Sequence, residues 1–314
     1  MSTKLRQRFV KDYSLPINVF DEKLFEYYRN LYDFFPEKQY QELIDNVNAN
    51  YNGNIEKWLD YCASVRDNAI DEVTNSEPFK EFKNCDLSRY AVDKKIAIGE
   101  HSYYNSNTDG CRFISVDLKK ANFQAFKYAG VINDEDYSSF IGKFGGDDYI
   151  KNSKYLRQVI LGNMNPKRQV TVENYMMSLI KTIVDELIPI GFDYYSFNSD
   201  EIVYKQNCEE FLGDINIICG VIERSVKERF NFDVRAEYIE ITKLPIVNVN
   251  NSDVDAFVRK NLNTGEEKLK KASTTFYPQI YKLWKGMDIE DNDLIFYAND
   301  QLAKFLEPLV LKIN

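Results

Sequence analysis

The chain of 314 residues contains very little histidine, because His101 is the only one. Histidine is central to catalytic triads and to most zinc sites. An enzyme with this sequence would therefore depend on carboxylates, lysines, hydroxyl groups or a bound metal ion. The five cysteines are dispersed, and none stands in a CxxC pair. Such spacing is typical of reduced structural thiols and does not indicate a disulfide framework or a zinc site.

Long apolar runs are also missing from the sequence. No stretch approaches the roughly 18 to 20 apolar residues of a membrane span. The first twenty residues include basic side chains but lack the apolar core of a secretory signal. We therefore expect a cytoplasmic protein that does not enter a membrane. Hydrophobic residues make up 44% of the chain and aromatic residues 14%, which favours a folded core over disorder.

The sequence has no excess of positive charge, because 49 acidic residues outnumber 40 basic ones and the net charge is −9. This balance alone disfavours a nucleic-acid-binding protein. Residues 112–168 differ from the rest, because ten basic residues there stand against six acidic ones, a net of +4. An ordinary fluctuation of charge would explain the segment by itself, but its position around the motifs described below makes it a candidate phosphate-binding region.

The apolar pattern predicts the secondary structure. Residues 21–88 have apolar side chains at every third or fourth position, which indicates helices. After residue 90 the pattern changes to short apolar runs separated by turn residues, which indicates strands. The elements expected from there on are strands at 94–104 and 111–117, helices at 118–130, 150–163 and 172–188, a hairpin at 194–205, a helix at 211–226 and a strand at 234–244.

From residue 112 to 244 the predicted order is strand, helices, hairpin, helix, strand. This order is the split βαβ arrangement of ferredoxin-like folds, and it predicts an α+β fold with an antiparallel sheet. We expect a helical N-terminal region at 1–88, an α+β domain at 89–245 and a mixed C-terminal region at 246–314. The last region is expected to end in a helix that carries Leu302, Phe305, Leu306 and Leu309.

Two carboxylates stand where predicted strands end or begin. Asp117 ends the strand at 111–117, and Asp200 lies at the hairpin tip just before Glu201. In a split βαβ sheet these strands are central neighbours, so Asp117 and Asp200 would meet at one edge. Carboxylates at such distances repel each other and favour a counter-cation such as Mg²⁺, which also neutralises nucleotide phosphates. A solvated acidic turn beside a strand that happens to end in Asp is the alternative.

The residues around these carboxylates resemble the palm domain of nucleic-acid polymerases, most closely the A-family DNA polymerases of bacteria and phages. Residues 113–127, "FISVDLKKANFQAFK", are similar to motif A, and residues 198–205, "NSDEIVYK", are similar to motif C. Residues 145–169 between them are similar to motif B. Ser199 stands where motif C usually has His, and Asn122 replaces the motif A Glu. The resemblance covers residues 112–206 and implies a palm-like domain with reduced fingers.

The resemblance implies a two-metal nucleotidyltransferase that joins a nucleoside triphosphate to a 3′ hydroxyl, with DNA or RNA as the second substrate. Asp117 and Asp200 would be catalytic and would bind Mg²⁺ or Mn²⁺, and Glu201 would assist them. The motif B lysine falls on Leu161, so Lys167 or Arg168 would replace it. The residues expected to contact phosphate are Lys119, Lys120, Arg157, Lys167 and Arg168.

Two other functions remain open at this stage. Residues 143–149, "KFGGDDY", are similar to the GGDEF signature of diguanylate cyclases, which would indicate a template-independent synthase of cyclic or oligomeric nucleotides. The following residues have a helical pattern, however, so Gly145 and Gly146 fit a loop before a helix with Asp147 and Asp148 at its N-terminus. The third possibility is a non-catalytic palm that acts as a nucleic-acid-binding or assembly subunit.

Overall fold

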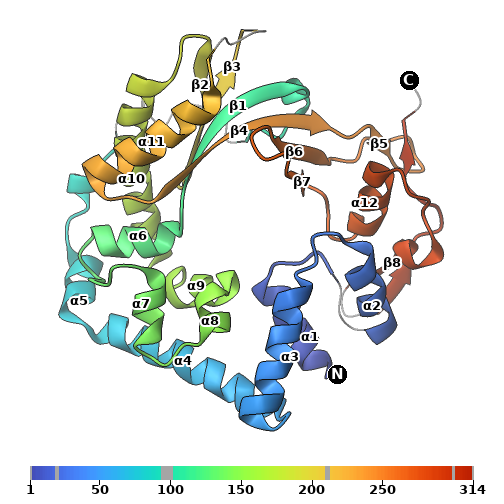
Figure 1. The fold of residues 1–314 in the computed structure, drawn as a ribbon, viewed down its shortest axis with the longest axis horizontal. Helices are drawn as coiled ribbons and strands as arrows, with labels where there is room; N and C mark the ends of the chain where they lie inside the picture. Colours follow the sequence, from blue (N-terminus) through green and yellow to red (C-terminus); the bar gives the residue numbers. More distant parts are fainter. Residues whose placement is uncertain (1, 18–20, 93–101, 209–212, 299–300, 313–314) are drawn as a thin grey trace. The chain divides into compact units, whose positions relative to one another are not determined.

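The computed structural model describes residues 2–17, 21–92, 102–208, 213–298 and 301–312 (Figure 1). The chain forms two compact units. The first, which we call the helical unit, consists of residues 1–86 and 125–169. The second, the sheet unit, consists of residues 87–124 and 170–314. The division into regions 1–88, 89–245 and 246–314 expected from the sequence stays a prediction.

The helical unit confirms the helices predicted for residues 21–88. Its core contains large side chains that are fully buried, among them Phe9, Phe25, Tyr40 and Trp58. Residues 125–169 add further helices to the same unit. The helices are α1 (Thr3–Asp12), α2 (Glu22–Leu31), α3 (Glu37–Tyr51), α4 (Ile55–Asn75), α5 (Glu77–Asn84), α7 (Tyr137–Gly142), α8 (Asp148–Asn152) and α9 (Lys154–Leu161).

Polar side chains define where several of these helices begin. The Asp21 carboxylate accepts hydrogen bonds from the backbone N–H groups of Lys23 and Leu24 at 2.7 and 3.1 Å. The Asn54 side chain accepts one from Lys57 at 3.1 Å. Each cap satisfies N–H groups that have no partner within the helix.

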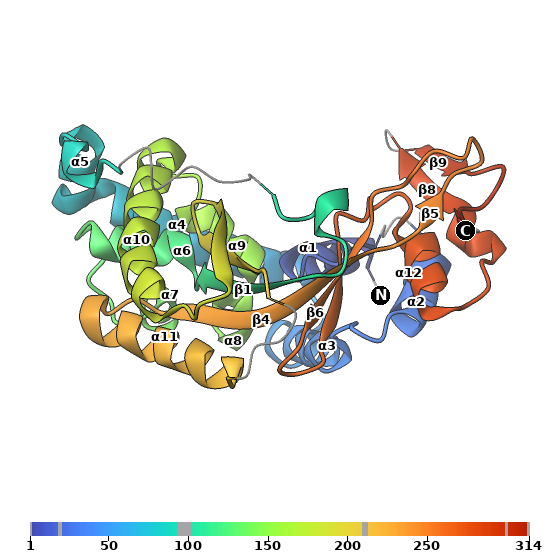
Figure 2. The same cartoon turned by 90° about the horizontal axis from the view of Figure 1, so that it is seen from above.

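The sheet unit is built on a six-stranded antiparallel sheet with the order β2-β3-β1-β4-β6-β7 (Figures 1 and 2). Strand β1 therefore lies between β3 and β4. The α+β class and the antiparallel sheet expected from the sequence are confirmed. The strands are β1 (Cys111–Leu118), β2 (Phe192–Phe197), β3 (Glu201–Gln206), β4 (Val234–Lys243), β6 (Phe257–Asn261) and β7 (Glu267–Lys270).

Apolar side chains cover both faces of the central strands. On one face Phe113, Val203, Ile239 and Phe257 form a buried cluster together with Tyr103. The other face packs against helices α10 (Pro166–Leu187) and α11 (Ile215–Phe230), and α11 runs alongside β4 (Figure 2). Helix α6 (Ala121–Tyr128) follows β1 and ends before Gly130, as predicted. A strand buried on both faces must exclude most charged residues, so each carboxylate at its end requires an explanation.

The predicted C-terminal helix is wrong. Residues 295–298 and 301–304 form the hairpin strands β8 (Ile295–Ala298) and β9 (Gln301–Lys304). Leu302 and Leu306 are 57% and 99% exposed, so the apolar spacing did not reflect a buried helix face. Pro308 stands inside the predicted helix, where its ring and its missing N–H disfavour helical structure. The chain then forms β10 (Val310–Leu311), which pairs with β5 (Ile246–Val247).

Two elements were not expected from the sequence. Helix α12 (Tyr277–Lys285) and the hairpin of β6 and β7 lie in the region that was predicted only as mixed. The strand predicted for residues 94–104 lies mostly outside the described residues. None of the helices in the described ranges combines the length and the apolar character that a membrane crossing requires.

The loop at residues 145–148 confirms the prediction of a loop before a helix. Gly145 has a φ of +80°, and a Cβ on Gly146 would lie 2.9 Å from the backbone oxygen of Ile141, so both positions favour glycine. The Asp147 carboxylate caps α8 by accepting from the Ile150 N–H at 2.9 Å and also accepts from the Asn46 side chain at 2.9 Å. These residues therefore have a structural role that requires no catalysis.

We expect Asp147→Ala to lower the free energy of unfolding by about 1–2 kcal/mol, because it removes a helix cap and leaves Asn46 without this acceptor. Asp148→Ala is the matched control, since the Asp148 side chain is 93% exposed. Urea denaturation of both variants measures the difference. Equal stabilities would show that the Asp147 cap contributes nothing.

Candidate functional site

The structure brings the three predicted catalytic residues together at one end of the sheet. Asp117 on β1 lies directly opposite Glu201 on β3 in the antiparallel register. The backbone N–H of Leu118 donates to the backbone oxygen of Asp200 at 2.7 Å, so the turn that holds Asp200 lies beside the end of β1. The Asn198 N–H donates to the Glu201 oxygen at 2.8 Å and closes this turn.

Charged residues of β4 complete this end of the sheet. Asp117 lies opposite Arg235, and Ser115 lies opposite Glu237. Because side chains alternate along a strand, Asp117, Arg235, Glu201 and Glu237 share one face. The Arg235 Nη2 atom is 3.4 Å from Asp117 Oδ2, and its Nε atom is 3.5 Å from Glu237 Oε2. Arg235 therefore connects carboxylates of two neighbouring strands.

Glu237 is held by two further partners on β6. The Arg259 Nη2 atom donates to Glu237 Oε2 at 2.7 Å, and the Asn261 side chain donates to Oε1 at 3.0 Å. Burial opposes the negative charge of Glu237, but the hydrogen bond and the charge of Arg259 hold the pKa of this carboxyl below its usual value. Glu237 thus remains ionised and keeps Arg235 oriented toward this face.

The ionisation of Asp117 is opposed by its burial and by the negative charges of its neighbours. Burial raises the pKa of Asp117 to about 6. The charge of Arg235 opposes this shift, whereas the negative charges of Glu201, Asp200 and Glu237 add to it. The side chain is still 29% exposed, so it can reach a ligand at the sheet edge.

Glu201 is fixed by hydrogen bonds from two buried hydroxyl groups. Its Oε1 atom accepts from the Tyr103 hydroxyl at 2.8 Å and from the Ser115 hydroxyl at 2.5 Å. Burial raises the pKa of Tyr103, so this phenol keeps its proton and remains a donor. One oxygen of Glu201 is thus occupied, which suits a residue that supports the site from a defined position.

The donor set suits a hard divalent cation. Among the described residues, no group of three or more His, Cys, Asp or Glu side chains is arranged to hold a metal ion. Mg²⁺, however, usually binds one or two carboxylates and takes its other ligands from water and substrate phosphates. Asp117 and Asp200 offer such carboxylates. Burial and, to a smaller extent, the charges of Glu201, Asp200 and Glu237 oppose the ionisation of Asp117, and a nearby cation would favour it.

Lys119 and Lys120 lie at the same end of the sheet as Asp117. Both side chains are exposed just after β1. The Lys119 N–H donates to the backbone oxygen of Asp233 at 2.9 Å, which ties this turn to the start of β4. The Gln124 side chain reinforces the link, since it donates to the Asp233 oxygen at 2.8 Å and accepts from its N–H at 2.9 Å. The backbone that carries the two lysines is therefore well defined.

The other three predicted phosphate contacts, Arg157, Lys167 and Arg168, belong to the helical unit. Arg157 lies 5.8 Å from the ring centre of Tyr137, and burial lowers its pKa. Arg168 donates to the backbone oxygen of Cys85, which follows α5. Both arginines thus make packing contacts within that unit, whereas Lys167 is exposed. Their role in binding phosphate stays a prediction.

Sequence reasoning missed three residues near the site: Glu173, Arg235 and Glu237. Glu173 on α10 is only 7% exposed, and burial together with the charge of Asp200 raises its pKa to about 7. The signal for Glu173 was an acid close to the apolar residues Val172, Met176 and Met177 of this helix. The signal for Arg235 and Glu237 was the alternation in "VRAEYIE", which places both on one face of the strand.

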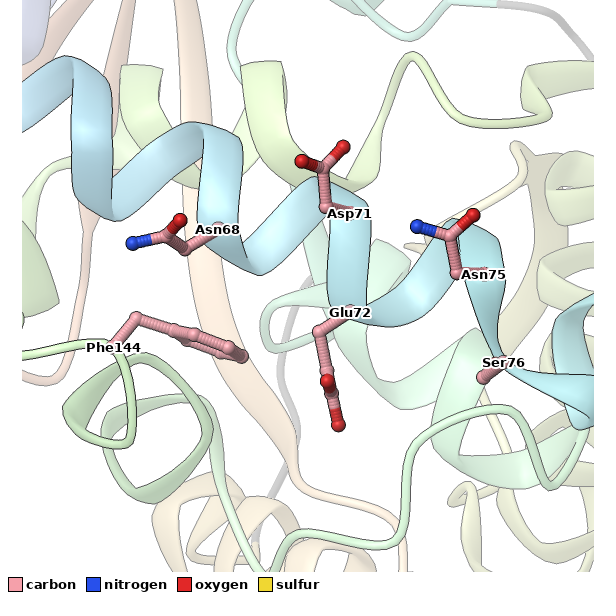
Figure 3. A pocket seen from close by; sticks show the side chains of 6 residues that line it. All are labelled: Asn68, Asp71, Glu72, Asn75, Ser76 and Phe144. Carbon is pink, nitrogen blue, oxygen red and sulfur yellow. The ribbon is translucent and has the colours of Figure 1, made fainter.

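Each unit contains a cavity. In the helical unit a cavity of about 490 Å³ is lined by one side of α4 and by Phe144 (Figure 3). Its acidic residues, Asp71 and Glu72, point in opposite directions, which does not suit a shared cation (Figure 3). In the sheet unit a cavity of about 450 Å³ includes Asn198 and Ser199, the residues just before Asp200.

Comparison of this chain with protein-family models, curated proteins and solved structures found no match. A functional assignment must therefore come from the residues themselves. The strongest assembly of such residues is the group at the end of β1 and β3, where Asp117, Asp200 and Glu201 meet.

We expect Glu173→Gln to stabilise the protein in a pH-dependent way. Glu173 has a folded-state pKa of about 7 and a reference value of 4.5, so its ionisation opposes folding increasingly as pH rises through that window. The variant should match the wild type near pH 4.5 and gain up to about 3 kcal/mol in free energy of unfolding at pH 8. Urea denaturation at several pH values measures the gain.

Glu186→Gln on the same helix is the control, because the Glu186 side chain is 64% exposed. It should show no comparable increase in stability with pH. A constant difference between Glu173→Gln and the wild type across pH 4.5 to 8 would contradict a raised pKa of Glu173.

Proposed function

We propose that this protein is a metal-dependent nucleotidyltransferase with a palm-like sheet unit, which joins a nucleoside triphosphate to a 3′ hydroxyl. The observation that carries the proposal is the meeting of Asp117 and Asp200 at one end of two neighbouring strands. Their order along the chain matches motifs A and C of the polymerase palm that the sequence resembles.

The strand order supports the palm-like fold. Strands β4, β1, β3 and β2 are neighbours in this order. A connection that contains helices α6 to α10 joins β1 to β2, and α11 joins β3 to β4. This is the split βαβ arrangement. It makes β1 a central strand and brings its C-terminal end to the hairpin tip, which is where a palm presents its carboxylates.

The residues at this end would have two roles in phosphoryl transfer, metal binding and phosphate binding. Asp117 and Asp200 would hold Mg²⁺, which when bound would neutralise phosphate charge and favour ionisation of the attacking hydroxyl. Arg235, Lys119 and Lys120 are described residues of the sheet unit that place cations at the same end as the carboxylates. Long basic side chains in this position suit the phosphates of a nucleotide or the backbone of a nucleic acid.

A non-catalytic palm is the second candidate, and two observations favour it. Arg235 already pairs with Asp117, and hydroxyl groups already occupy one oxygen of Glu201. The site is thus partly satisfied without a metal ion. The cyclase alternative has less support, because the GGDD residues begin a helix and do not form a hairpin tip.

We expect Asp117→Asn and Asp200→Asn to lower nucleotide incorporation by about 100-fold or more, because each removes a charge that would hold the metal ion. The assay uses labelled nucleoside triphosphates, Mg²⁺ or Mn²⁺, and DNA or RNA primer–templates, with product analysis by size. A template-dependent ladder supports a polymerase, and a small nuclease-resistant product supports a cyclase-like synthase.

Asp193→Asn is the matched control, since Asp193 is an exposed acid on β2 at the other end of the hairpin. It should retain activity. If Asp200→Asn incorporated nucleotide as well as Asp193→Asn, the metal-binding role of Asp200 would be wrong.

Metal binding can be measured without catalysis. Mn²⁺ with a non-hydrolysable nucleoside triphosphate, each at about tenfold above its dissociation constant, should raise the melting temperature by roughly 2–4 °C. Asp117→Asn and Asp200→Asn should lose this shift, and Asp193→Asn should keep it. The absence of any shift in the wild-type protein would support the non-catalytic palm.

A further inference from the structure

The cavity of the sheet unit lies next to the candidate site and has no role in the function proposed so far. Its volume is about 450 Å³. It is formed by the end of β2, the turn to β3, one side of α10 and the segment before residue 93. The lining residues are Tyr90, Ala91, Val92, Val170, Thr171, Asn174, Phe197, Asn198 and Ser199.

The size of this cavity suits a small organic ligand. Small-molecule sites typically have volumes of roughly 300–1,000 Å³ and combine apolar walls with a few polar groups. The cavity falls within this range and is large enough for a heterocyclic base with its sugar. It is too small for a folded peptide segment or a nucleic-acid duplex.

The lining chemistry is aromatic and neutral. Tyr90 and Phe197 contribute rings, Asn174 and Asn198 contribute amides, and Thr171 and Ser199 contribute hydroxyl groups. Among the lining residues that the structure describes, none carries a charge. Amides and hydroxyls both donate and accept hydrogen bonds. A flat ring with donors and acceptors along its edge would match this lining. A free phosphate would find no cation among these described residues, and a purely apolar ligand would leave the amides without partners.

The cavity is adjacent to the carboxylates through two elements. Ser199 directly precedes Asp200 in the turn, and Asn174 directly follows Glu173 on α10. The lining of the cavity includes both Asn174 and Ser199, so this part of α10 and the turn lie on the same cavity. A ligand seated against Asn174 and Ser199 would therefore have its next chemical group near Asp200.

We propose that this cavity binds the base and sugar of a nucleoside, with the base between Tyr90 and Phe197 and its polar edge on Asn174 and Asn198. The extension to a nucleoside triphosphate, whose phosphates would lie toward Asp200, rests on the proposed function. Binding of the uncharged nucleoside does not, because it requires neither a metal ion nor catalysis.

The test is a titration of the wild-type protein with adenosine, guanosine, cytidine and uridine in the presence of EDTA, followed by ligand-observed NMR. At least one nucleoside should bind. Asn174→Leu should raise its dissociation constant by about tenfold or more, since the variant loses an amide partner and narrows the cavity. Thr171→Val is a second variant with a smaller change of volume and should weaken binding in the same direction.

Asn68→Leu is the matched control, because Asn68 is also a helical asparagine but lines the cavity of the helical unit (Figure 3). Its dissociation constant should equal that of the wild type. Circular dichroism confirms that each variant is folded. The inference is overturned if no nucleoside binds to the wild type, or if folded Asn174→Leu and Thr171→Val bind as the wild type does.

Failure of this inference can be told apart from failure of the proposed function. A protein that binds a nucleoside in EDTA but incorporates no nucleotide with Mg²⁺ or Mn²⁺ keeps the cavity assignment and loses the catalytic one. A protein that incorporates nucleotide with the same KM in Asn174→Leu as in the wild type keeps the catalytic assignment and loses the cavity.

Discussion

The burial of Asp117 on the central strand β1 is the constraint on which the candidate site depends. A carboxylate in this position loses much of its hydration, and Glu201, Asp200 and Glu237 add negative charge around it. A cation must compensate, and Arg235 on the neighbouring strand supplies one. The antiparallel pairing of β1 with β4 thus determines the electrostatics of the site, because it sets Arg235 directly opposite Asp117.

Stability alone does not explain this arrangement. Partly buried ion pairs contribute little net free energy, and apolar residues of similar volume often fill such positions equally well. The sheet already has an apolar cluster on the same face, formed by residues such as Phe113 and Ile239. Burial and the neighbouring carboxylates together raise the pKa of Asp117. A carboxyl that is perturbed in this way is a candidate for a functional site.

Much of the fold followed from the sequence because local patterns were strong. The helices of residues 21–88, the strand that ends near Asp117 and the hairpin around Asp200 all have clear apolar periodicity. The C-terminal helix failed because four apolar residues matched a helical spacing by chance across Pro308. The pairing of Asp117 with Arg235 could not be predicted, since it depends on the register between strands more than a hundred residues apart.

The dependence on strand register also explains why the sequence predicted Arg157 and Arg168 as phosphate-binding residues but did not identify Arg235. A local excess of basic residues says nothing about their partners, and both arginines make packing contacts in the helical unit. Arg235 stands in a strand with equal numbers of acidic and basic residues, and its register gives it two carboxylate partners, Asp117 and Glu237. If a metal ion were bound by Asp117, Arg235 would still contact Glu237, whose negative charge is stabilised by Arg259. The arginine could therefore release Asp117 to a cation without becoming an isolated charge, and it would then be available to a phosphate at the same edge.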